Sequence, residues 1–359
     1  MLGAQLYQKF LPQEYDVFCG IDVDKKKMLV TLTDHQDQTK SVQMPSDPGI
    51  LIRYVDKHFP AKRIAFAYEA GPTGYKLHDQ LTAQGYPCLV LAPSMIPQAP
   101  GQQVKTNRLD SKKIAESLRG GQVRSIHVPS SAYRHLRHLT QLRDTFVKEV
   151  VAFKCRIKAL LLFEGIPFPK ASVNGQWSQR VLEELKRLPV NESVRFKLDQ
   201  LLSSLSFACE QALKTQKEIR RFCTSDPELS RCVRYLTTIP GIGWIVATHL
   251  LARIGDWRLL THVRQIAGFL GLAPRESSTG ERRRQGSITG IGDGRLQAKL
   301  IQSAWVSIHK DTELESFYRN IYQKHPRDRA ARKAIVAVAR KLTTRIYCVL
   351  KEQRPYVVR

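Results

Sequence analysis

The chain has 359 residues, and its 57 Lys and Arg against 32 Asp and Glu give a formal net charge of +25. This length suits two or three domains, and a hydrophobic content of 42% is that of a globular protein with real cores. So large an excess of positive charge predicts a polyanionic partner that is bound through its phosphates. We find no long apolar run and no signal-peptide core in the opening MLGAQLYQKFLPQEYD, so we expect a cytoplasmic protein without a membrane partner.

Several common catalytic and metal-binding patterns are missing from the sequence. The seven cysteines form no CxxC pair and no Cys/His set with zinc spacing, so they are interpreted as reduced thiols. We find no P-loop, no GxGxxG after a strand and no HExxH. These absences argue against a P-loop nucleotide-binding protein, a dinucleotide-binding protein and a zinc protease.

The first part of the chain predicts a mixed α/β sheet. Residues 16–32, DVFCGIDVDKKKMLVTL, have the alternation of two strands joined by a short polar turn. A strand at 41–44, a helix at 48–58, a strand at 63–68, a helix at 75–84 and a strand at 87–91 follow. The order βββαβαβ favours a mixed sheet with helices on its faces, as in ribonuclease-H-like domains.

Four oxygen-bearing side chains recur at the ends of these elements. Asp22 ends the first buried strand, and Glu69 directly follows a later one. Asn107 and Asp110 are three residues apart on a predicted helix, so they share a face. Three carboxylates and one amide form a set suited to Mg²⁺ or Mn²⁺. Each acid alone is more simply a structural residue, and Asp24 suits a turn; the combination favours a metal site.

The middle of the chain predicts long helices. Apolar residues recur at three- and four-residue steps from 136 to 163, and a Pro/Gly break precedes helical patterns at 177–188 and 194–219. An antiparallel helical hairpin or coiled coil would separate two domains and offer a surface for oligomerisation. We therefore expect domains at residues 1–128, 129–230 and 231–359. An ordinary helical core is the alternative.

The last part of the chain contains two further patterns. The sequence PGIG, with Gly241 and Gly243, lies between apolar helices as in helix-hairpin-helix modules, whose turns direct N–H groups at phosphates. The stretch LAPRESSTGERRRQGSITGIGDGRL places Ser277 and Ser278 next to Arg282, Arg283 and Arg284. Guanidinium groups compensate phosphate charge, so this segment predicts a serine nucleophile or a phosphate-binding loop, with further cations at Arg275 and Arg295. On these residues alone, an exposed basic turn that only contacts the nucleic-acid backbone is the simpler interpretation.

Several of these segments together resemble one known family. The segments GIDVDKKKMLV, AYEAGPTGY and VKTNRLDSKKIAESLRGGQVRSIHVP resemble the N-terminal domain of DEDD-type insertion-sequence transposases. That group includes the Piv-type invertases and the bridge-RNA-guided recombinases. IPGIGWIVATHLLARIGDW and the serine segment resemble the family's C-terminal transposase domain. The similarity covers both ends of the chain in the same order.

The resemblance implies a RuvC-like domain, a helical transposase domain and a recombinase of a prokaryotic insertion sequence. It implies a metal site at Asp22, Glu69, Asn107 and Asp110, and a serine nucleophile at Ser278, with Ser277 as the alternative. The family pattern has Asp where this chain has Asn107, which removes one negative charge from the site. The implied partners are double-stranded DNA, a structured guide RNA and further copies of the chain in a dimer or tetramer.

Two alternative functions stay open. One is a RuvC-like nuclease or Holliday-junction resolvase, in which water is the nucleophile and the serine segment only holds DNA. The other is a non-catalytic nucleic-acid-binding relative, which the amide at Asn107 favours.

Overall fold

The computed structural model describes residues 10–93, 107–123, 125–169, 177–276, 285–289 and 292–357. Two compact units meet in the chain between Val128 and Pro129. A further domain boundary near residue 230 stays a prediction.

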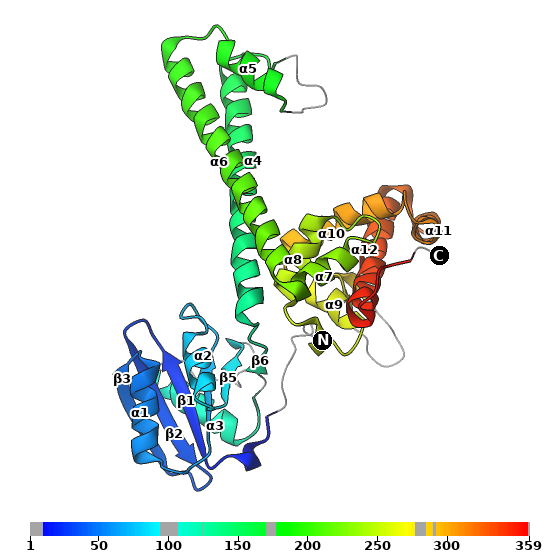
Figure 1. The fold of residues 1–359 in the computed structure, drawn as a ribbon. Helices are drawn as coiled ribbons and strands as arrows, with labels where there is room; N and C mark the ends of the chain where they lie inside the picture. The colour runs from blue at the N-terminus through cyan, green and yellow to red at the C-terminus, as the bar shows by residue number, and fades with distance from the viewer. Residues whose placement is uncertain are drawn as a thin grey trace. The chain divides into compact units, whose positions relative to one another are not determined.

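The N-terminal unit is built on a mixed six-stranded sheet (Figure 1). Its strands are β1 (Val17–Val23), β2 (Lys27–Asp34), β3 (Thr39–Pro45), β4 (Ile64–Glu69), β5 (Cys88–Leu91) and β6 (Ser125–Ile126). The order across the sheet is β3-β2-β1-β4-β5-β6; β1, β4 and β5 are parallel, and the other neighbours are antiparallel. The predicted order βββαβαβ is present, and the short β6 was not predicted. The sheet fits a ribonuclease-H-like domain.

Helices cover both faces of this sheet. They are α1 (Pro48–His58), α2 (Lys76–Ala83) and α3 (Asn107–Arg119), after a short 3-10 turn η1 (Pro12–Glu14). One core joins Cys19, Ile21 and Phe66 to α1 and α2. A second core on the opposite face joins Phe18 and Ala67 to α3. Because side chains alternate along a strand, neighbours in β1 and β4 face different helices.

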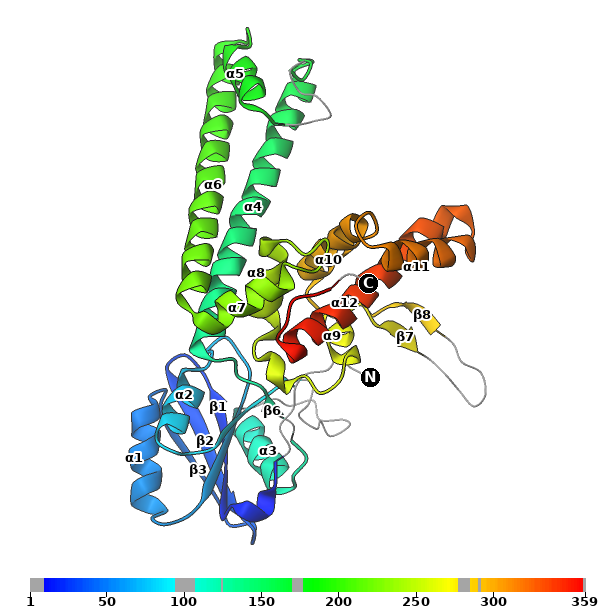
Figure 2. The ribbon, with the colours of Figure 1, turned by 45° about the vertical axis from the view of Figure 1, so that its right-hand side comes forward.

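A long helical hairpin opens the second unit. It consists of α4 (Ser131–Phe163), α5 (Gln179–Arg187) and α6 (Glu192–Ser225). Figures 1 and 2 show α4 and α6 side by side and antiparallel, with α5 beside their far end. Their shared core includes Ile157, Leu161, Leu198 and Leu202. Asn191 caps the N-terminus of α6, because its side chain accepts a hydrogen bond from Val194 N at 2.9 Å.

The rest of the second unit is mainly helical. It comprises α7 (Pro227–Leu236), α8 (Trp244–Ile254), a 3-10 turn η4 (Trp257–Leu259), α9 (Arg264–Phe269), β7 (Pro274–Glu276), β8 (Gln285–Ile288), α10 (Gly294–Ser307), α11 (Thr312–Gln323) and α12 (Arg327–Glu352). Helix α12 packs against α7, α9, α10 and α11, so it forms the core of this region. Its Arg345 is 7% exposed and pairs with Asp311, which is 1% exposed. The β7–β8 hairpin and α11 were not predicted.

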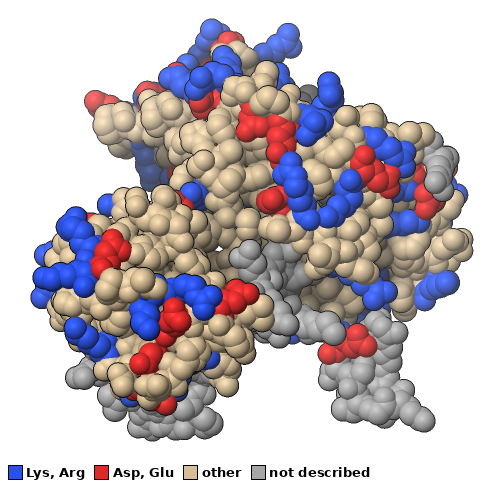
Figure 3. All heavy atoms as spheres, turned by 60° about the horizontal axis from the view of Figure 1, so that its bottom comes forward, with Lys and Arg blue, Asp and Glu red and all other residues tan. Residues whose placement is uncertain are grey.

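The surface carries many more cations than anions. On the face drawn in Figure 3, Lys and Arg side chains are spread over both units and are interspersed with fewer carboxylates. In the first half of α12, Arg327, Arg329 and Arg332 are exposed. Among the described residues, no helix is both long and apolar enough to cross a lipid bilayer.

Candidate active site

Asp22 and Glu69 lie on the same face of the sheet, at the carboxyl ends of two adjacent parallel strands. In β1, Ile21 points into the core under α1 and α2, so Asp22 points to the α3 face. In β4, Tyr68 belongs to the same core as Ile21, so Glu69 also faces α3. Parallel strands end at one edge of a sheet, and this edge is where α/β proteins bind ligands.

Helix α3 brings Asp110 to this edge. The helix lies close to the sheet because β1 has a glycine at the contact: a Cβ on Gly20 would be 2.1 Å from Ser111 O and 2.4 Å from Ala115 N. The Ser111 hydroxyl is also 2.8 Å from the buried Thr31 hydroxyl on β2. Asp110 stands in the first turn of α3, next to this contact, and is half-buried.

The charges of these carboxylates act on one another. Burial raises the pKa of Asp22, and the negative charges of Asp110, Glu69 and Asp24 raise it further. Burial and like charges both disfavour the carboxylate form, so the protonated form of Asp22 is stabilised relative to it. Within the described part of the chain, no three His, Cys, Asp or Glu side chains are gathered closely enough to hold a metal ion as they stand.

The donor chemistry of this edge nevertheless fits a hard divalent cation. Three carboxylates are oxygen ligands of the kind Mg²⁺ and Mn²⁺ prefer, and a cation would relieve the repulsion that raises the pKa of Asp22. Asn107 is the first residue of α3, one turn before Asp110. Its side chain lies outside the described residues, so its part in the set rests on the sequence.

Asp24 has a different role, in the turn between β1 and β2. Its carboxylate accepts a hydrogen bond from Lys25 N at 2.6 Å, and Asp24 N donates to Lys27 O at 3.0 Å. The interpretation of Asp24 as a turn residue is therefore confirmed. Its backbone oxygen accepts a hydrogen bond from the Ser46 hydroxyl at 2.5 Å, which ties this turn to the end of β3.

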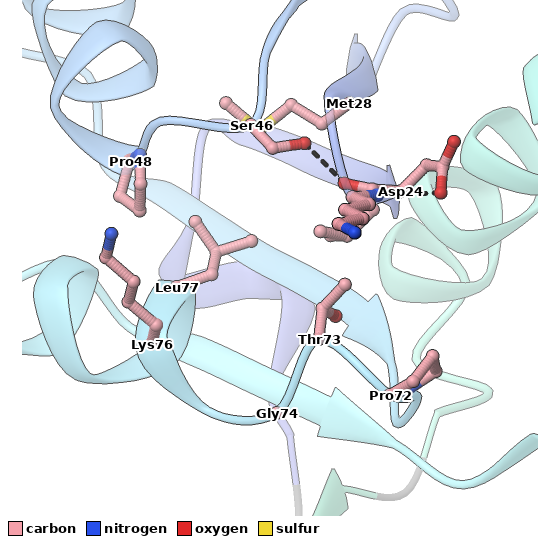
Figure 4. A pocket seen from close by; sticks show the side chains of 11 residues that line it. Asp24, Met28, Ser46, Pro48, Pro72, Thr73, Gly74, Lys76 and Leu77 are labelled. Carbon is pink, nitrogen blue, oxygen red and sulfur yellow. Dashed lines mark hydrogen bonds between the residues drawn. The ribbon is translucent and has the colours of Figure 1, made fainter.

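A cavity of about 550 Å³ opens beside this turn on the α1 and α2 face of the sheet (Figure 4). Met28, Pro48 and Leu77 form its apolar wall, and Lys76 and Thr73 contribute polar groups. Figure 4 shows the Asp24 carboxylate directed away from the cavity. Asp22 and Glu69 face the other side of the sheet, so this cavity is separate from the acidic edge.

The predicted serine segment connects β7 and β8. Glu276 and Gln285 are paired across this hairpin, which projects from the second unit in Figure 2. The residues between them, including the predicted Ser277, Ser278, Arg282, Arg283 and Arg284, lie outside the described residues. Of the flanking cations, Arg275 donates to Thr289 O at 3.3 Å and Arg295 is exposed at the start of α10.

The two glycines of the PGIG turn differ in their surroundings. Gly241 has a φ of +85°, and a Cβ there would be 2.3 Å from Ser303 O and 2.4 Å from the Ser307 hydroxyl. That hydroxyl donates to Pro240 O at 2.6 Å, so this part of the turn packs against α10. Gly243 is exposed at the N-cap of α8, where N–H groups are available to an anion.

A charged cluster in the second unit was not predicted. Asp144 on α4 accepts hydrogen bonds from Lys299 on α10 at 3.0 and 3.1 Å, and its carboxylate is 3.1 Å from His249 Nε2 on α8. Burial alone would raise the pKa of Asp144, but the hydrogen bonds and charges of His249 and Lys299 outweigh it and lower the pKa to about 2. The cluster brings together residues 105 and 155 positions apart, so no local sequence signal marks it.

An acidic edge on a ribonuclease-H-like sheet is typical of metal-dependent enzymes that act on nucleic acids. Comparison with known families gives a more specific class. A transposase family model of the DEDD type, associated with IS110, matches residues 19–164. A second model, described as the transposase IS116/IS110/IS902 family, matches residues 233–319.

Individual relatives agree with both matches. The protein named "Putative transposase y4qE" of Sinorhizobium fredii is 31% identical over 297 residues, covering 81% of this chain and 71% of its own. The transposase for insertion sequence element IS1111A of Coxiella burnetii is 25% identical over 70% of this chain and 68% of its own. The pilin gene-inverting protein of Moraxella bovis is 35% identical over 37% of this chain and 41% of its own.

The chain therefore belongs to the DEDD transposases of the IS110 type. This membership implies an enzyme that cleaves and rejoins DNA and depends in general on divalent metal ions. The predicted family is confirmed.

Proposed function

We propose that this transposase mobilises or inverts a DNA segment through a covalent serine–DNA intermediate, with a divalent metal held at the acidic edge. The observation that carries the proposal is that Asp22, Glu69 and Asp110 share one edge of the sheet, where burial and then the charges of Asp110 and Glu69 raise the pKa of Asp22. Repulsion among carboxylates is costly, and a site that retains it is typical of metal binding and catalysis.

The metal site would consist of Asp22, Glu69 and Asp110, with the amide oxygen of Asn107 assisting. A bound Mg²⁺ or Mn²⁺ would supply positive charge beside the scissile phosphate. The three carboxylates would keep that charge at the edge of the sheet, and the packing of α3 on Gly20 would hold Asp110 in place. The neutral side chain of Asn107 leaves the set with one negative charge fewer than the family pattern.

The nucleophile in this proposal is the Ser278 hydroxyl, with Ser277 as the alternative. Its oxygen attacks the scissile phosphorus, a serine–phosphate ester forms, the bond from phosphorus to the leaving sugar oxygen breaks, and the serine proton passes to solvent or to that oxygen. The ester conserves the energy of the phosphodiester, so rejoining needs no ATP. Arg282, Arg283 and Arg284 would stabilise the phosphate charge.

The partners belong to the same proposal. Double-stranded DNA is the substrate, and a structured guide RNA made by the element would select it. A net charge of +25 favours binding of both polyanions, because DNA and RNA phosphates attract cations equally. We also propose a dimer or tetramer, in which the metal site and the serine of one reaction centre come from different copies.

The metal site is tested by thermal unfolding of the full chain with and without Mg²⁺ or Mn²⁺. A ligand that binds only the folded state stabilises it by about 2.7 kcal/mol at a concentration of about 100 times Kd. We expect the wild type to gain this stabilisation and Asp22→Asn to lose most of it. Without metal, Asp22→Asn should unfold at an equal or higher temperature, because one of the repelling charges is gone.

The matched control is Asp24→Asn. It removes a neighbouring charge that also raises the pKa of Asp22, but Asp24 is outside the proposed ligand set. This variant should retain the metal stabilisation of the wild type. If Asp22→Asn and Asp24→Asn lost the metal stabilisation equally, a site built on Asp22 would be contradicted. That result would indicate that the acidic edge attracts cations without binding them at one site.

A further inference from the structure

A second cavity, of about 410 Å³, lies in the second unit (the C-terminal unit), where α4 and α8 meet the start of α10. Three of its lining residues are arginines, namely Arg137, Arg253 and Arg295. The hydroxyl-bearing Thr140 and Thr145 add polar groups to the wall. The volume is at the lower end of the range of about 300–1,000 Å³ found for small-ligand sites, so it exceeds the needs of a single ion.

Backbone and aromatic contacts position two of these arginines, Arg137 and Arg253. Arg137 Nε donates to Ala252 O at 3.0 Å, which caps the end of α8. The Arg253 guanidinium stacks over the Phe269 ring at 5.3 Å. Arg253 Nε is 4.0 Å from Asp293 Oδ2, too far for a hydrogen bond, and it is buried without a hydrogen-bond partner among the described residues.

The carboxylates at the cavity are already engaged elsewhere. Asp144 is bound by Lys299 and His249. Asp293 is the N-cap of α10 and accepts hydrogen bonds from Arg295 N and Leu296 N. Lys299 and Arg143 also lie next to Asp144, so the three arginines that line the cavity are not neutralised by its two carboxylates.

We propose that this cavity binds one backbone phosphate, together with its sugar, of the nucleic acid strand that the C-terminal unit holds, through Arg253 and Arg295. An arginine fork suits a phosphodiester, since its donors match two phosphate oxygens. This inference rests on one part of the proposed function, namely that the protein binds nucleic acid. DNA and RNA offer the same phosphate chemistry, so the experiment includes both.

The test is equilibrium binding of the full chain to labelled double-stranded DNA and to labelled RNA, measured by fluorescence anisotropy in EDTA over a series of salt concentrations. The Arg253→Gln variant should weaken binding about tenfold and reduce the slope of log K against log salt by about 1, as expected for one lost phosphate contact. If the variant loses affinity for DNA alone, the cavity binds a DNA phosphate; if it loses affinity for RNA alone, the cavity binds an RNA phosphate. Either result supports the proposal.

The control variant is Arg329→Gln. Arg329 is exposed on α12 and pairs with the adjacent Asp328, so its removal changes the net charge equally without touching the cavity. Its affinity should stay within about twofold of the wild type. The proposal would be overturned if Arg253→Gln and Arg329→Gln lost equal affinity. It would also be overturned if Arg253→Gln left the slope of log K against log salt unchanged.

A double variant tests whether Arg253 and Arg295 share one phosphate. If they do, Arg253→Gln with Arg295→Gln should reduce the slope by about 1, as either change alone does, because the same contact is lost. A reduction by about 2 would contradict a shared phosphate. Arg253→Lys keeps the packing stem and the charge, so it provides the comparison if Arg253→Gln fails to fold. Binding in EDTA requires no strand cleavage, so failure of the serine chemistry leaves these results unaffected.

Discussion

Gly20 illustrates how one residue sets the geometry of the acidic edge. Its missing side chain lets the backbone of α3 touch β1, and this contact places Asp110 on the face that Asp22 and Glu69 share. Glycine inside a strand often marks such a close approach of backbone. The sequence therefore contained the signal for this contact, whereas the predicted ligand set used only the acids and the amide.

The contact predicts the effect of Gly20→Ala. A methyl group 2.1 Å from Ser111 O must push α3 away from the sheet, and overpacking of this kind costs about 1–3 kcal/mol. We expect urea unfolding to show that the variant loses unfolding free energy at the upper end of that range. We also expect Mg²⁺ or Mn²⁺ to stabilise the variant less than it stabilises the wild type. Gly71→Ala is the control, because its Cβ would meet nothing nearer than 3.8 Å. Equal stability of the two variants would contradict a structural role for Gly20.

At the same scale, the sequence predicted Asp22 and Glu69 for a simple reason. Each acid lies at the end of a predicted strand, and the structure shows that these two strands are parallel neighbours. Their coupling to Asp110 is visible only in the folded chain, because it depends on how α3 crosses the sheet. The serine has no comparable geometric support, since Ser277 and Ser278 lie outside the described residues.

At the scale of elements, the Asp144 cluster joins the hairpin to the C-terminal helices. Asp144 belongs to α4, His249 to α8 and Lys299 to α10, and all three side chains are less than 20% exposed. Helical periodicity predicted α4, and the apolar helices around the PGIG turn predicted α8, as separate elements. It carries no information on which faces meet over long sequence distances, so this connection could not be predicted.

The cluster predicts how stability depends on pH. The pKa of Asp144 is lowered to about 2 in the folded state, so its stabilisation is present above the unfolded pKa of about 3.9 and is lost as pH falls from about 4 to 2. Asp144→Asn should lower the unfolding free energy by about 1–3 kcal/mol at pH 7, and this difference should shrink below about pH 4. Urea unfolding at several pH values measures both effects.

The control for this measurement is Glu210→Gln on α6. Glu210 forms an exposed ion pair with Lys214, and exposed pairs of this kind contribute little. Its unfolding curve should match that of the wild type at pH 7. A loss in Glu210→Gln as large as that in Asp144→Asn would contradict the special role of the cluster.

At the scale of the whole molecule, charge and family point to the same chemistry. A net charge of +25 predicted a polyanionic partner, and membership of the DEDD transposases identifies DNA as what the enzyme cleaves and rejoins. The order of elements in the N-terminal sheet was predictable because each strand and helix carries its own periodicity. The short β6 and β7 were missed, since strands of two and three residues have too few side chains to show a pattern, and β8 was missed with its partner β7.

The central claim is a metal-supported serine nucleophile, and covalent trapping tests it most directly. The full chain is incubated with Mg²⁺, any RNA that purifies with it and labelled DNA spanning an end of the element, and is then denatured and resolved on a gel. We expect a covalent protein–DNA band in the wild type and in Ser277→Ala, and none in Ser278→Ala or Asp22→Ala. Metal-dependent nicking without any covalent band would contradict the claim and would identify water as the nucleophile.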